Sequence, residues 1–483
     1  MILFGTGGIR GIMREGEFDE KTVAVASKGV ANYMKMNNLH KVLIAYDTRN
    51  NSEKFAKIAA SVFSGEGLDA YLFSEPVPTP VLSYGVRKLK MDMGIVITAS
   101  HNPPEYNGYK VYTSNGVQAI PEVTDVLAKL VENAWNEPIN AVEKYNFVSH
   151  DMLDEYVQDV ARLIGERLDG LKVVYSPLHG TGARFVPQLL RLLGAEVIEV
   201  KEQMEHNGNF PTVKTPNPED DRALELLKDY MVKFNVDLGI ATDPDADRVG
   251  VVFKNVRLTG NNVGVLLSDN LIDEYRKSGK NNGMLVKTIV STNMVVPMCK
   301  ENGIKLFEVP TGFKFIGDLV EKRKDLDFVI GFEESCGYLT GDLARDKDAV
   351  LASGLVARVA KKVDLLERLK ELYGKYGYYF ENLLNFELGS VEKSYAVYEK
   401  MKSFSIDGLK NIVDYSKGFD GVIPNETLRL DFDYGMIFVR PSGTEPKMKA
   451  YVMVKGESSE DTKAKLEKLS NEMIEIVKKL SEG

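Results

Sequence analysis

The sequence has few of the features that mark secreted or membrane proteins. Only two cysteines occur among its 483 residues, Cys299 and Cys336, so no disulfide framework is expected and a reducing cytoplasm fits. No apolar run approaches the roughly 18 residues that a membrane-spanning helix needs. The first residues also lack the basic and apolar regions of a signal peptide. We therefore expect a cytoplasmic protein with no membrane partner.

An excess of positive charge is also missing. The chain has 61 Lys and Arg against 70 Asp and Glu, which gives a net charge of -9. No basic block dominates, and this argues against nucleic acid as the main partner. An acidic protein can still bind a small anion through a local cluster of arginine and lysine. The length predicts several domains, and the oligomeric state is left open.

A polar turn follows the apolar run Met93–Ile97, which predicts a buried strand. The turn is Thr98–Pro103 (TASHNP), and its proline prevents the chain from continuing as a helix or a central strand. Ser100 is therefore expected at the carboxyl end of a strand, where open α/β sheets bind ligands. Its hydroxyl could carry a phosphoryl group there. A turn whose serine bonds only to backbone is an equally good interpretation of the hexapeptide alone.

The same strand and polar end recur along the chain. Residues 92–98 (DMGIVIT) are echoed by 237–243 (DLGIATD) and, more loosely, by 327–333 (DFVIGFE). Divergent internal repeats of one structural unit explain this better than chance. Because different polar residues follow each copy, we expect three strand ends with different chemistries, from three domains that face one cleft.

Three carboxylates follow the second copy. Asp243, Asp245 and Asp247 alternate along the chain, and Pro244 stiffens the turn. Alternate side chains of extended or loop backbone point to one side, so the carboxylates should converge. Such hard oxygen donors suit Mg²⁺, whereas without a cation they would repel one another strongly. The alternative, a solvated acidic loop, fits poorly because the cluster ends a buried strand.

Further polar residues follow the third copy. Glu333 and Ser335 can both face a polyol through hydrogen bonds, and Cys336 beside them is interpreted as a packing residue. Lys347 lies shortly after, where it could contact a phosphate or, with a lowered pKa, act as an acid or base. Lys110 is close enough in sequence to Ser100 to return beside it.

Three other segments are candidate anion sites. Residues 440–447 (RPSGTEPK) lie between two predicted strands and combine arginine, hydroxyls and glycine amides, as a phosphate cradle does. Residues 176–182 (SPLHGTG) enter a predicted helix, so their amides could bind an anion. Residues 5–11 (GTGGIRG) bring Arg10 beside a glycine-rich turn. An ordinary hairpin turn is the alternative for the first and last of these segments.

Strands alternate with helices through most of the chain, which predicts βαβ units and largely parallel sheets. The last part instead reads helix, strands and a terminal helix. The predicted fold class is α/β with four domains: three related mixed or parallel α/β domains and a C-terminal α+β domain around a central cleft. We expect these domains at residues 1–150, 151–258, 259–372 and 373–483.

Together the motifs resemble the α-D-phosphohexomutase family, which includes phosphoglucomutases and phosphomannomutases. The resemblance covers essentially the whole chain. Four motifs stand in the family order, namely the phosphoserine loop at Ser100, the magnesium loop at 243–247, the sugar-binding loop at 333–335 and the phosphate-binding loop at 440–444. Many bacterial members have glycine and histidine after the serine of the sugar loop, where this chain has Cys336 and Gly337. That run instead resembles the phosphoglucomutase and phosphopentomutase branch.

The resemblance implies a phosphoglucomutase that interconverts glucose 1-phosphate and glucose 6-phosphate. Its implied cofactors are one Mg²⁺ per chain and glucose 1,6-bisphosphate, as intermediate and activator, and its partners are sugar phosphates. The implied catalytic residues are Ser100, Lys110, Arg10, His101 and Lys347, and the implied metal ligands are Ser100, Asp243, Asp245 and Asp247. The implied substrate-binding residues are Thr311, Gly312, Lys314, Glu333, Ser335, Arg345, Arg440, Ser442, Gly443, Thr444, Lys447 and Arg248.

Several alternatives stay open. Phosphopentomutase or phosphomannomutase activity would use the same motifs on another sugar. A phosphatase would also use a metal and a phosphoenzyme, and a regulator that binds sugar phosphates without catalysis would keep the fold. The sequence does not decide the preferred sugar, nor which lysine is the general acid or base.

Overall fold

The computed structural model describes residues 8–406, 408–442 and 446–482. The chain packs into two compact units. The first contains residues up to Leu271 together with Gly312–Leu365, and the second contains Ile272–Thr311 together with the chain from Leu366 onward. Within the described residues, no helix combines the length and the apolar character that crossing a membrane requires.

The first unit begins with a six-stranded sheet of order β1-β5-β4-β2-β3-β6. Its strands are β1 (Ile9–Ile12), β2 (Lys41–Tyr46), β3 (Asp69–Leu72), β4 (Met93–Ile97), β5 (Tyr106–Thr113) and β6 (Asn146–Phe147). Four helices accompany it, namely α1 (Glu20–Met36), α2 (Ser52–Gly65), α3 (Thr79–Lys88) and α4 (Pro121–Ala134). The strands β2, β3, β4 and β6 are parallel, whereas β5 runs antiparallel to both β4 and β1.

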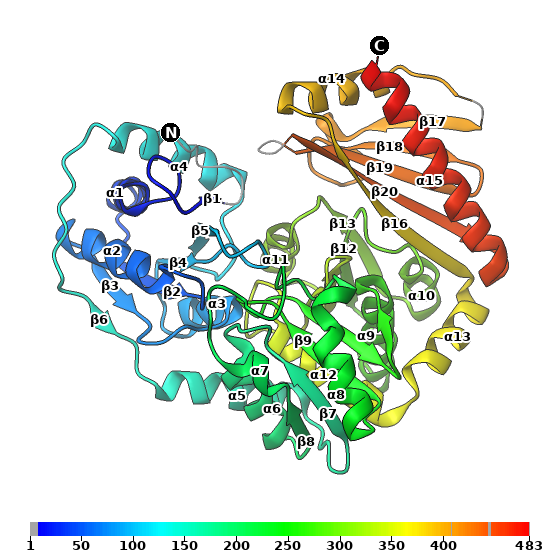
Figure 1. Ribbon diagram of the computed structural model, residues 1–483, viewed down its shortest axis with the longest axis horizontal. Coiled ribbons are helices and arrows are strands. Elements are labelled where there is room, and N and C mark those ends of the chain that lie inside the picture. Colours follow the sequence, from blue (N-terminus) through cyan, green and yellow to red (C-terminus); the bar gives the residue numbers. More distant parts are fainter. Residues whose placement is uncertain (1–7, 407, 443–445, 483) are drawn as a thin grey trace. The chain divides into compact units, whose positions relative to one another are not determined.

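Helices cover both faces of this sheet, as the N-terminal, blue and cyan part of Figure 1 shows. The helices α1, α2 and α4 pack on one face, over side chains such as Ile44 and Ile95. The opposite face of β2 carries Leu43, against which α3 packs at Gly85. Because β4 is buried along its whole length, its sequence is a continuous apolar run rather than an alternating one.

A second sheet follows, of order β11-β10-β9-β7-β8. Its strands are β7 (Lys172–Ser176), β8 (Glu196–Glu199), β9 (Leu238–Thr242), β10 (Val249–Phe253) and β11 (Val256–Leu258). Its helices are α5 (Asp151–Ile164), α6 (Gly182–Leu192), α7 (Lys201–Met204), the short 3₁₀ helix η1 (Asp221–Leu224) and α8 (Glu225–Phe234). The strands β7, β8 and β9 are parallel, and β10 returns antiparallel to β9.

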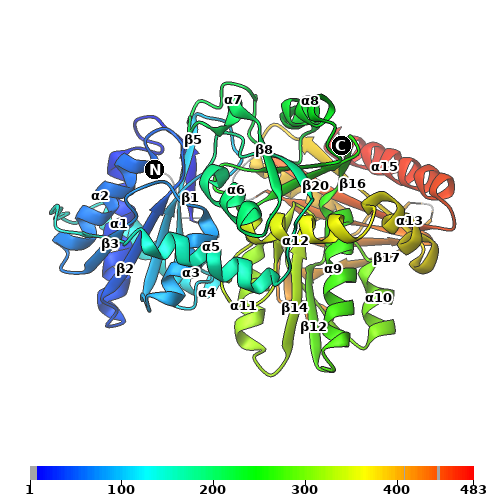
Figure 2. The same ribbon diagram turned by 90° about the horizontal axis from the view of Figure 1, so that it is seen from below.

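The rest of the first unit contains β14 (Asp327–Glu333) and β15 (Gly337–Leu339), which pair antiparallel, with α11 (Phe313–Lys322) and α12 (Ala349–Lys362). Figure 2 shows α5, α6 and α12 side by side. The helices α9 (Gly260–Lys277) and α13 (Leu365–Tyr376) each run from one unit into the other.

The second unit contains the parallel pair β12 (Gly283–Thr288) and β13 (Lys305–Val309), with α10 (Val295–Asn302). It continues as an antiparallel sheet of order β16-β20-β19-β18-β17. The strands of this sheet are β16 (Tyr378–Glu387), β17 (Leu409–Asp414), β18 (Leu428–Phe432), β19 (Gly435–Pro441) and β20 (Lys447–Gly456). Its helices are α14 (Val391–Met401), the 3₁₀ helix η2 (Tyr415–Lys417) and α15 (Ser459–Glu482).

Alternation along β19 and β20 gives this antiparallel sheet two apolar faces. Ile437 and Val452 belong to the core under α14 and α15. Phe438 and Tyr451 point to the other face and pack with Ile289 and Val290, which follow β12. Side chains of successive strand residues point to opposite faces, so both contacts follow from one alternating sequence.

The predicted repeat corresponds to a unit of two strands. Each echoed segment forms a strand, β4, β9 or β14, and an antiparallel strand follows it after a polar turn. The sequence analysis predicted the first strand of each pair but not the returning ones. The predicted α/β organisation with a C-terminal α+β part is confirmed, and the return strands make the sheets mixed.

The contact between α1 and α4 tests this packing. A Cβ atom at Gly29 would lie 2.7 Å from the Cα atom of Val131, so Gly29→Ala should force the helices apart and destabilise the protein by about 1–3 kcal/mol. Gly374→Ala in α13 is the control, because outside its own helix no described atom lies within 4 Å of that position. It should stabilise the protein by up to about 1 kcal/mol. Thermal unfolding measures both variants, and equal melting temperatures would contradict the helix contact.

Candidate active site

Ser100 lies in the turn that follows β4. Its hydroxyl donates a hydrogen bond to Oδ2 of Asp243 at 2.7 Å, and its backbone N–H donates to Oγ1 of Thr98 at 2.8 Å. The backbone φ of Ser100 is +51°, in the left-handed region that residues other than glycine rarely adopt. Nδ1 of His101 lies 3.2 Å from the same hydroxyl. The surrounding turn therefore imposes the conformation that directs Ser100 at the aspartates.

Arg49, which the sequence analysis missed, holds this turn. Its guanidinium donates hydrogen bonds to four backbone carbonyls, those of Ser100, Asn102, Pro103 and Tyr106. Asp47 lies beside it, with 3.4 Å between Nε and Oδ2. The signal in the sequence was the polar run Asp47–Arg49 at the end of strand β2, which follows the same pattern as the three recognised strand ends.

The three aspartates lie together in the turn between β9 and β10. Asp243, Asp245 and Asp247 are buried, and one oxygen of each lies within 4.8 Å of the others. Oδ1 of Asp243 accepts hydrogen bonds from the backbone N–H groups of Asp247 and Arg248, at 3.1 and 3.0 Å. These bonds close the turn and direct its carboxylates inward.

Two lysines approach the aspartates from other strand ends. Nζ of Lys110, on β5, lies 3.2 Å from Oδ2 of Asp245. Nζ of Lys347, which follows β15, lies 2.9 Å from Oδ2 of Asp247. The register of β4 and β5 pairs Val96 with Lys110, which explains why Lys110 returns beside Ser100 as expected.

The crowded charges shift the pKa values of the aspartates in different directions. Burial, and then the charges of the other two aspartates, raise the pKa of Asp243 well above its ordinary value. Burial and the charge of Asp245 likewise raise the pKa of Asp247. Burial would also raise the pKa of Asp245, but Lys110, Lys347 and the hydroxyl of Thr79 outweigh it and lower that pKa. Burial and mutual repulsion therefore oppose ionisation of Asp243 and Asp247.

The aspartate turn fits a divalent cation. Oδ1 of Asp245 and Oδ1 of Asp247 are buried and accept no hydrogen bond from any described residue. Buried acceptors normally have a partner. Carboxylate oxygens are the donors that Mg²⁺ prefers, so these two atoms and a third oxygen from Asp243 form a suitable set.

Glu333 and Lys347 bring the sugar-loop motif to the same region. Glu333 ends β14 and is buried, and the space at Gly337 is bounded by the side chains of both Glu333 and Lys347. Burial would lower the pKa of Lys347, but Asp247, Asp346 and Glu333 outweigh it and raise that pKa above its ordinary value. The lowered pKa that the sequence analysis considered for Lys347 is therefore wrong.

Burial and neighbouring charges shift the pKa values of Arg248 and His101. Arg248 is partly buried and forms an ion pair with Glu219. Burial would lower its pKa, but the charges of Glu219 and Asp247 outweigh burial and raise that pKa. Burial, followed by the charges of Arg248 and Arg10, lowers the pKa of His101 well below its ordinary value. His101 is therefore neutral at pH 7.

Arg345 is bound to other protein groups. Its guanidinium donates to Glu321, to Asp342 and to the carbonyl oxygen of Ala344, and only 2% of the residue is exposed. Its backbone N–H donates to Oγ of Ser83 at 2.8 Å. These bonds fasten the loop before Lys347.

The other predicted residues are distributed as follows. Arg10 is exposed on β1 and donates to Oδ1 of Asn102 at 3.2 Å. Lys314 is buried near the start of α11, which Gly312 precedes. Ser335 lies in the turn between β14 and β15, and Thr311 and the loop from Arg440 to Lys447 belong to the second unit. In that loop the N–H of Ser442 donates to the carbonyl of Lys447 at 2.9 Å, and Gly443 and Thr444 lie outside the described residues.

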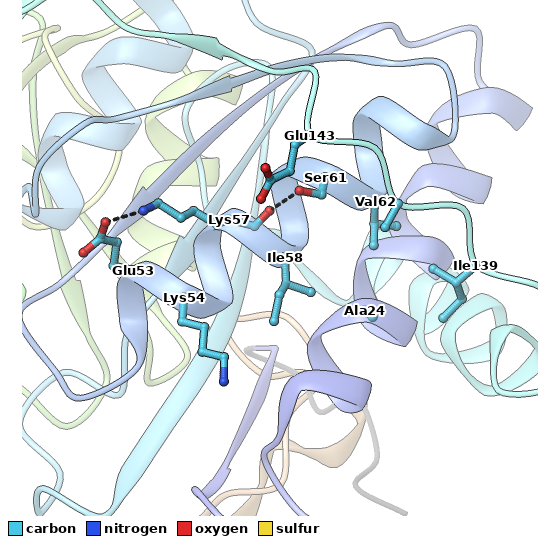
Figure 3. A pocket seen from close by; sticks show the side chains of 10 residues that line it. Ala24, Glu53, Lys54, Lys57, Ile58, Ser61, Val62, Ile139 and Glu143 are labelled. Atoms are coloured by element: carbon cyan, nitrogen blue, oxygen red, sulfur yellow. Dashed lines mark hydrogen bonds and ion pairs between the residues drawn. The ribbon is translucent and has the colours of Figure 1, made fainter.

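A surface groove of about 620 Å³ lies elsewhere in the first unit, between α1, α2 and residues 139–143 (Figure 3). It contains none of the predicted site residues. Both of its lysines are already paired, Lys57 with Glu53 and Lys54 with Glu20. The groove therefore lacks the serine, the aspartate cluster and the arginines that lie at the strand ends.

Comparisons with known proteins agree with this geometry. Four profiles match the chain in order, described as phosphoglucomutase/phosphomannomutase α/β/α domains I, II and III and the C-terminal domain, at residues 1–137, 154–259, 259–376 and 383–472. The chain belongs to the phosphoglucomutase/phosphomannomutase family. Enzymes of this family are isomerases that move a phosphoryl group within one sugar phosphate, so the predicted enzyme class is confirmed.

Individual relatives agree over nearly the full length. A phosphoglucomutase of Staphylococcus saprophyticus is 34% identical, over 95% of this chain and 92% of the relative. A phosphoglucomutase of Staphylococcus aureus strain MRSA252 is 32% identical, over 96% and 92%. A solved phosphoglucomutase/phosphomannomutase family protein from Burkholderia thailandensis shares the fold, with a TM-score of 0.78, 20% identity and coverage of 100% of this chain and 99% of that one.

Arg49 gives a testable prediction for the serine turn. Arg49→Lys keeps the charge but loses the planar fork, so at least one buried, charged hydrogen bond is lost, worth about 1.5–3 kcal/mol. Amide hydrogen exchange of residues 101–106 should become about tenfold faster or more. The control is Arg167→Lys, at an exposed arginine paired with Asp169. Equal exchange of the turn in both variants would show that Arg49 does not hold it.

Proposed function

We propose that this protein is a magnesium-dependent phosphoglucomutase that interconverts glucose 1-phosphate and glucose 6-phosphate. The main support is the 2.7 Å hydrogen bond that the Ser100 hydroxyl donates to Asp243. It lies in a buried turn where oxygens of Asp245 and Asp247 accept no hydrogen bond from the described residues. Relatives named phosphoglucomutase, 32–34% identical over nearly the whole chain, support glucose as the sugar. An Aspergillus fumigatus mutase of the same fold, with a TM-score of 0.58 and 14% identity over 100% of this chain and 95% of that one, is described as solved with GlcNAc-6P and magnesium.

Ser100 is the phosphoryl carrier in this proposal. The free hydroxyl of the sugar phosphate attacks phosphoserine 100, the bond from phosphorus to Oγ breaks, and glucose 1,6-bisphosphate forms. After this intermediate turns over in the site, its other phosphate returns to Ser100, which restores the enzyme and releases the isomer. Nδ1 of His101 lies 3.2 Å from Oγ, and His101 is proposed as a catalytic residue beside the carrier.

The charged groups around Ser100 are assigned to metal binding, proton transfer and stabilisation of the phosphate. Asp243, Asp245, Asp247 and the serine phosphate would hold Mg²⁺, which withdraws charge from the transferring group. Lys110 is proposed to remove or supply the proton of the attacking hydroxyl, and it can remove that proton only in its neutral form. Lys347 stays protonated because its pKa is raised, and it stabilises the phosphate together with Arg10 and Arg248.

Sugar recognition falls to the loop after β14 and its neighbours. Glu333 and Ser335 bind the sugar hydroxyls, and Thr311, Gly312 and Lys314 complete this part of the site. Arg345 stays a predicted substrate ligand, although its bonds to Glu321 and Asp342 favour a structural role in the loop. The proposed domain boundaries, near residues 150, 258 and 372, give each α/β domain one strand end with its own chemistry.

Ser100→Ala tests this function. The wild-type protein should convert glucose 1-phosphate to glucose 6-phosphate and carry one phosphate on the peptide with Ser100, as mass spectrometry shows. The variant should lose both, because no other group receives the phosphoryl. Ser61→Ala is the control, since that hydroxyl only donates to the Lys57 carbonyl. An active, unphosphorylated Ser100→Ala variant would overturn the proposal. Faster turnover of mannose or ribose phosphates would select a related mutase, and release of inorganic phosphate a phosphatase.

Arg440 is assigned to binding the phosphate that is not transferred, together with Ser442, Gly443, Thr444 and Lys447. A guanidinium can grip two phosphate oxygens, worth about 1.5–3 kcal/mol as charged hydrogen bonds. Arg440→Ala should therefore raise KM about 10–100-fold, with kcat less affected. Lys410→Ala, an exposed lysine paired with Asp433 in the same sheet, is the control. An unchanged KM with a collapsed kcat would instead place Arg440 at the transferring phosphate.

A further inference from the structure

Three helices begin at the aspartate turn. Successive carbonyls of the turn, those of Pro244, Asp245 and Ala246, accept hydrogen bonds from the backbone N–H groups of Thr181, Thr79 and Ala349, at 2.9, 2.8 and 3.2 Å. Thr79 is the first residue of α3, Thr181 precedes α6, and Ala349 is the first residue of α12. Each α/β segment of the first unit thus supplies one donor.

These contacts account for the anion-binding turn that the sequence analysis considered at residues 176–182. The amides of His179, Gly180 and Thr181 already donate to the carbonyls of Gln203, Pro177 and Pro244. A Cβ atom at Gly180 would lie 2.5 Å from the Cα atom of Pro244. The turn is therefore a backbone support for the aspartates, and the amides of His179, Gly180 and Thr181 are not available to an anion.

Thr79 differs from the other two donors because it also contacts a carboxylate. Its hydroxyl donates to Oδ2 of Asp245 at 2.8 Å, whereas the Thr181 hydroxyl donates to the carbonyl of Pro244 at 3.0 Å. Thr79 is fully buried and lies between Pro78 and Pro80. Proline has a fixed φ and no N–H, so the tripeptide offers a single amide donor on a stiff backbone.

We propose that Thr79 is a positioning residue of the magnesium site. With Lys110, it occupies Oδ2 of Asp245 and fixes the rotation of that carboxylate. Oδ1, which is buried and accepts no hydrogen bond from the described residues, is then directed to the ion. A carboxylate free to rotate would lose part of its affinity, since hydrogen bonds from an outer shell orient metal ligands. This inference rests on the proposed magnesium site.

Magnesium titration of the dephosphorylated full-length protein by isothermal calorimetry tests the inference. Thr79→Val keeps the shape and the backbone donor but removes the hydroxyl, and it should weaken Mg²⁺ binding about tenfold or more. Thr79→Ser keeps the hydroxyl and should restore the wild-type affinity. Thr181→Val is the matched control, since it loses a hydroxyl bond to the same turn but none to a carboxylate, and it should keep the wild-type affinity.

A kinetic measurement separates positioning from general damage. Thr79→Val should need more Mg²⁺ for half-maximal turnover and recover kcat when Mg²⁺ is saturating, whereas a distorted fold would lower kcat at every concentration. If Thr79→Val does not fold, as judged by thermal unfolding, Thr79→Ala takes its place. Wild-type affinity in a folded Thr79→Val or Thr79→Ala variant would overturn this inference. No Mg²⁺ binding by the wild-type protein would instead overturn the proposed metal site.

Discussion

The central constraint on the structure is the burial of three carboxylates in one short turn. Like charges so close in a poorly solvated place repel one another, and the surrounding fold counters this at several points. Two lysines and Arg248 supply positive charge, and the amides of Asp247 and Arg248 bond to Asp243. Three helix N-termini add the positive ends of their dipoles. A cation would complete the compensation at the carboxylate oxygens of Asp245 and Asp247 that accept no hydrogen bond from described residues.

The repeated strand and return unit explains how distant residues come together. In each copy, a buried strand delivers polar side chains at its end and an antiparallel strand leads back. The first copy provides Ser100 and Lys110, and the second provides the aspartates. The third provides Glu333, with Lys347 following its return strand. One backbone plan therefore supplies the proposed phosphoryl carrier, the proposed metal ligands and the candidate sugar ligand.

The sequence predicted the parts that depend on local pattern. The strand Met93–Ile97 and the aspartates after β9 follow from an apolar run that ends in polar residues. Thr79 gave no such signal, because it bonds to a group far along the chain, Asp245, 166 residues away. Arg49 follows an apolar strand as part of a polar run, but its role depends on carbonyls about 50 residues away. The direction of the Lys347 pKa was missed because Asp247 and Glu333 come close to that lysine only after folding. The roles of individual site residues stay predictions.

The grip of Arg49 on the serine turn has a consequence for how this protein can change over evolution. Its four acceptors are main-chain carbonyls, which every amino acid possesses. Side chains along the turn can therefore be exchanged while the path of the backbone is kept. Substitutions along the turn can therefore accumulate without loss of the backbone bonds that hold Ser100 toward the aspartates. The position of Ser100 itself is the exception, because it combines a reactive hydroxyl with a left-handed backbone.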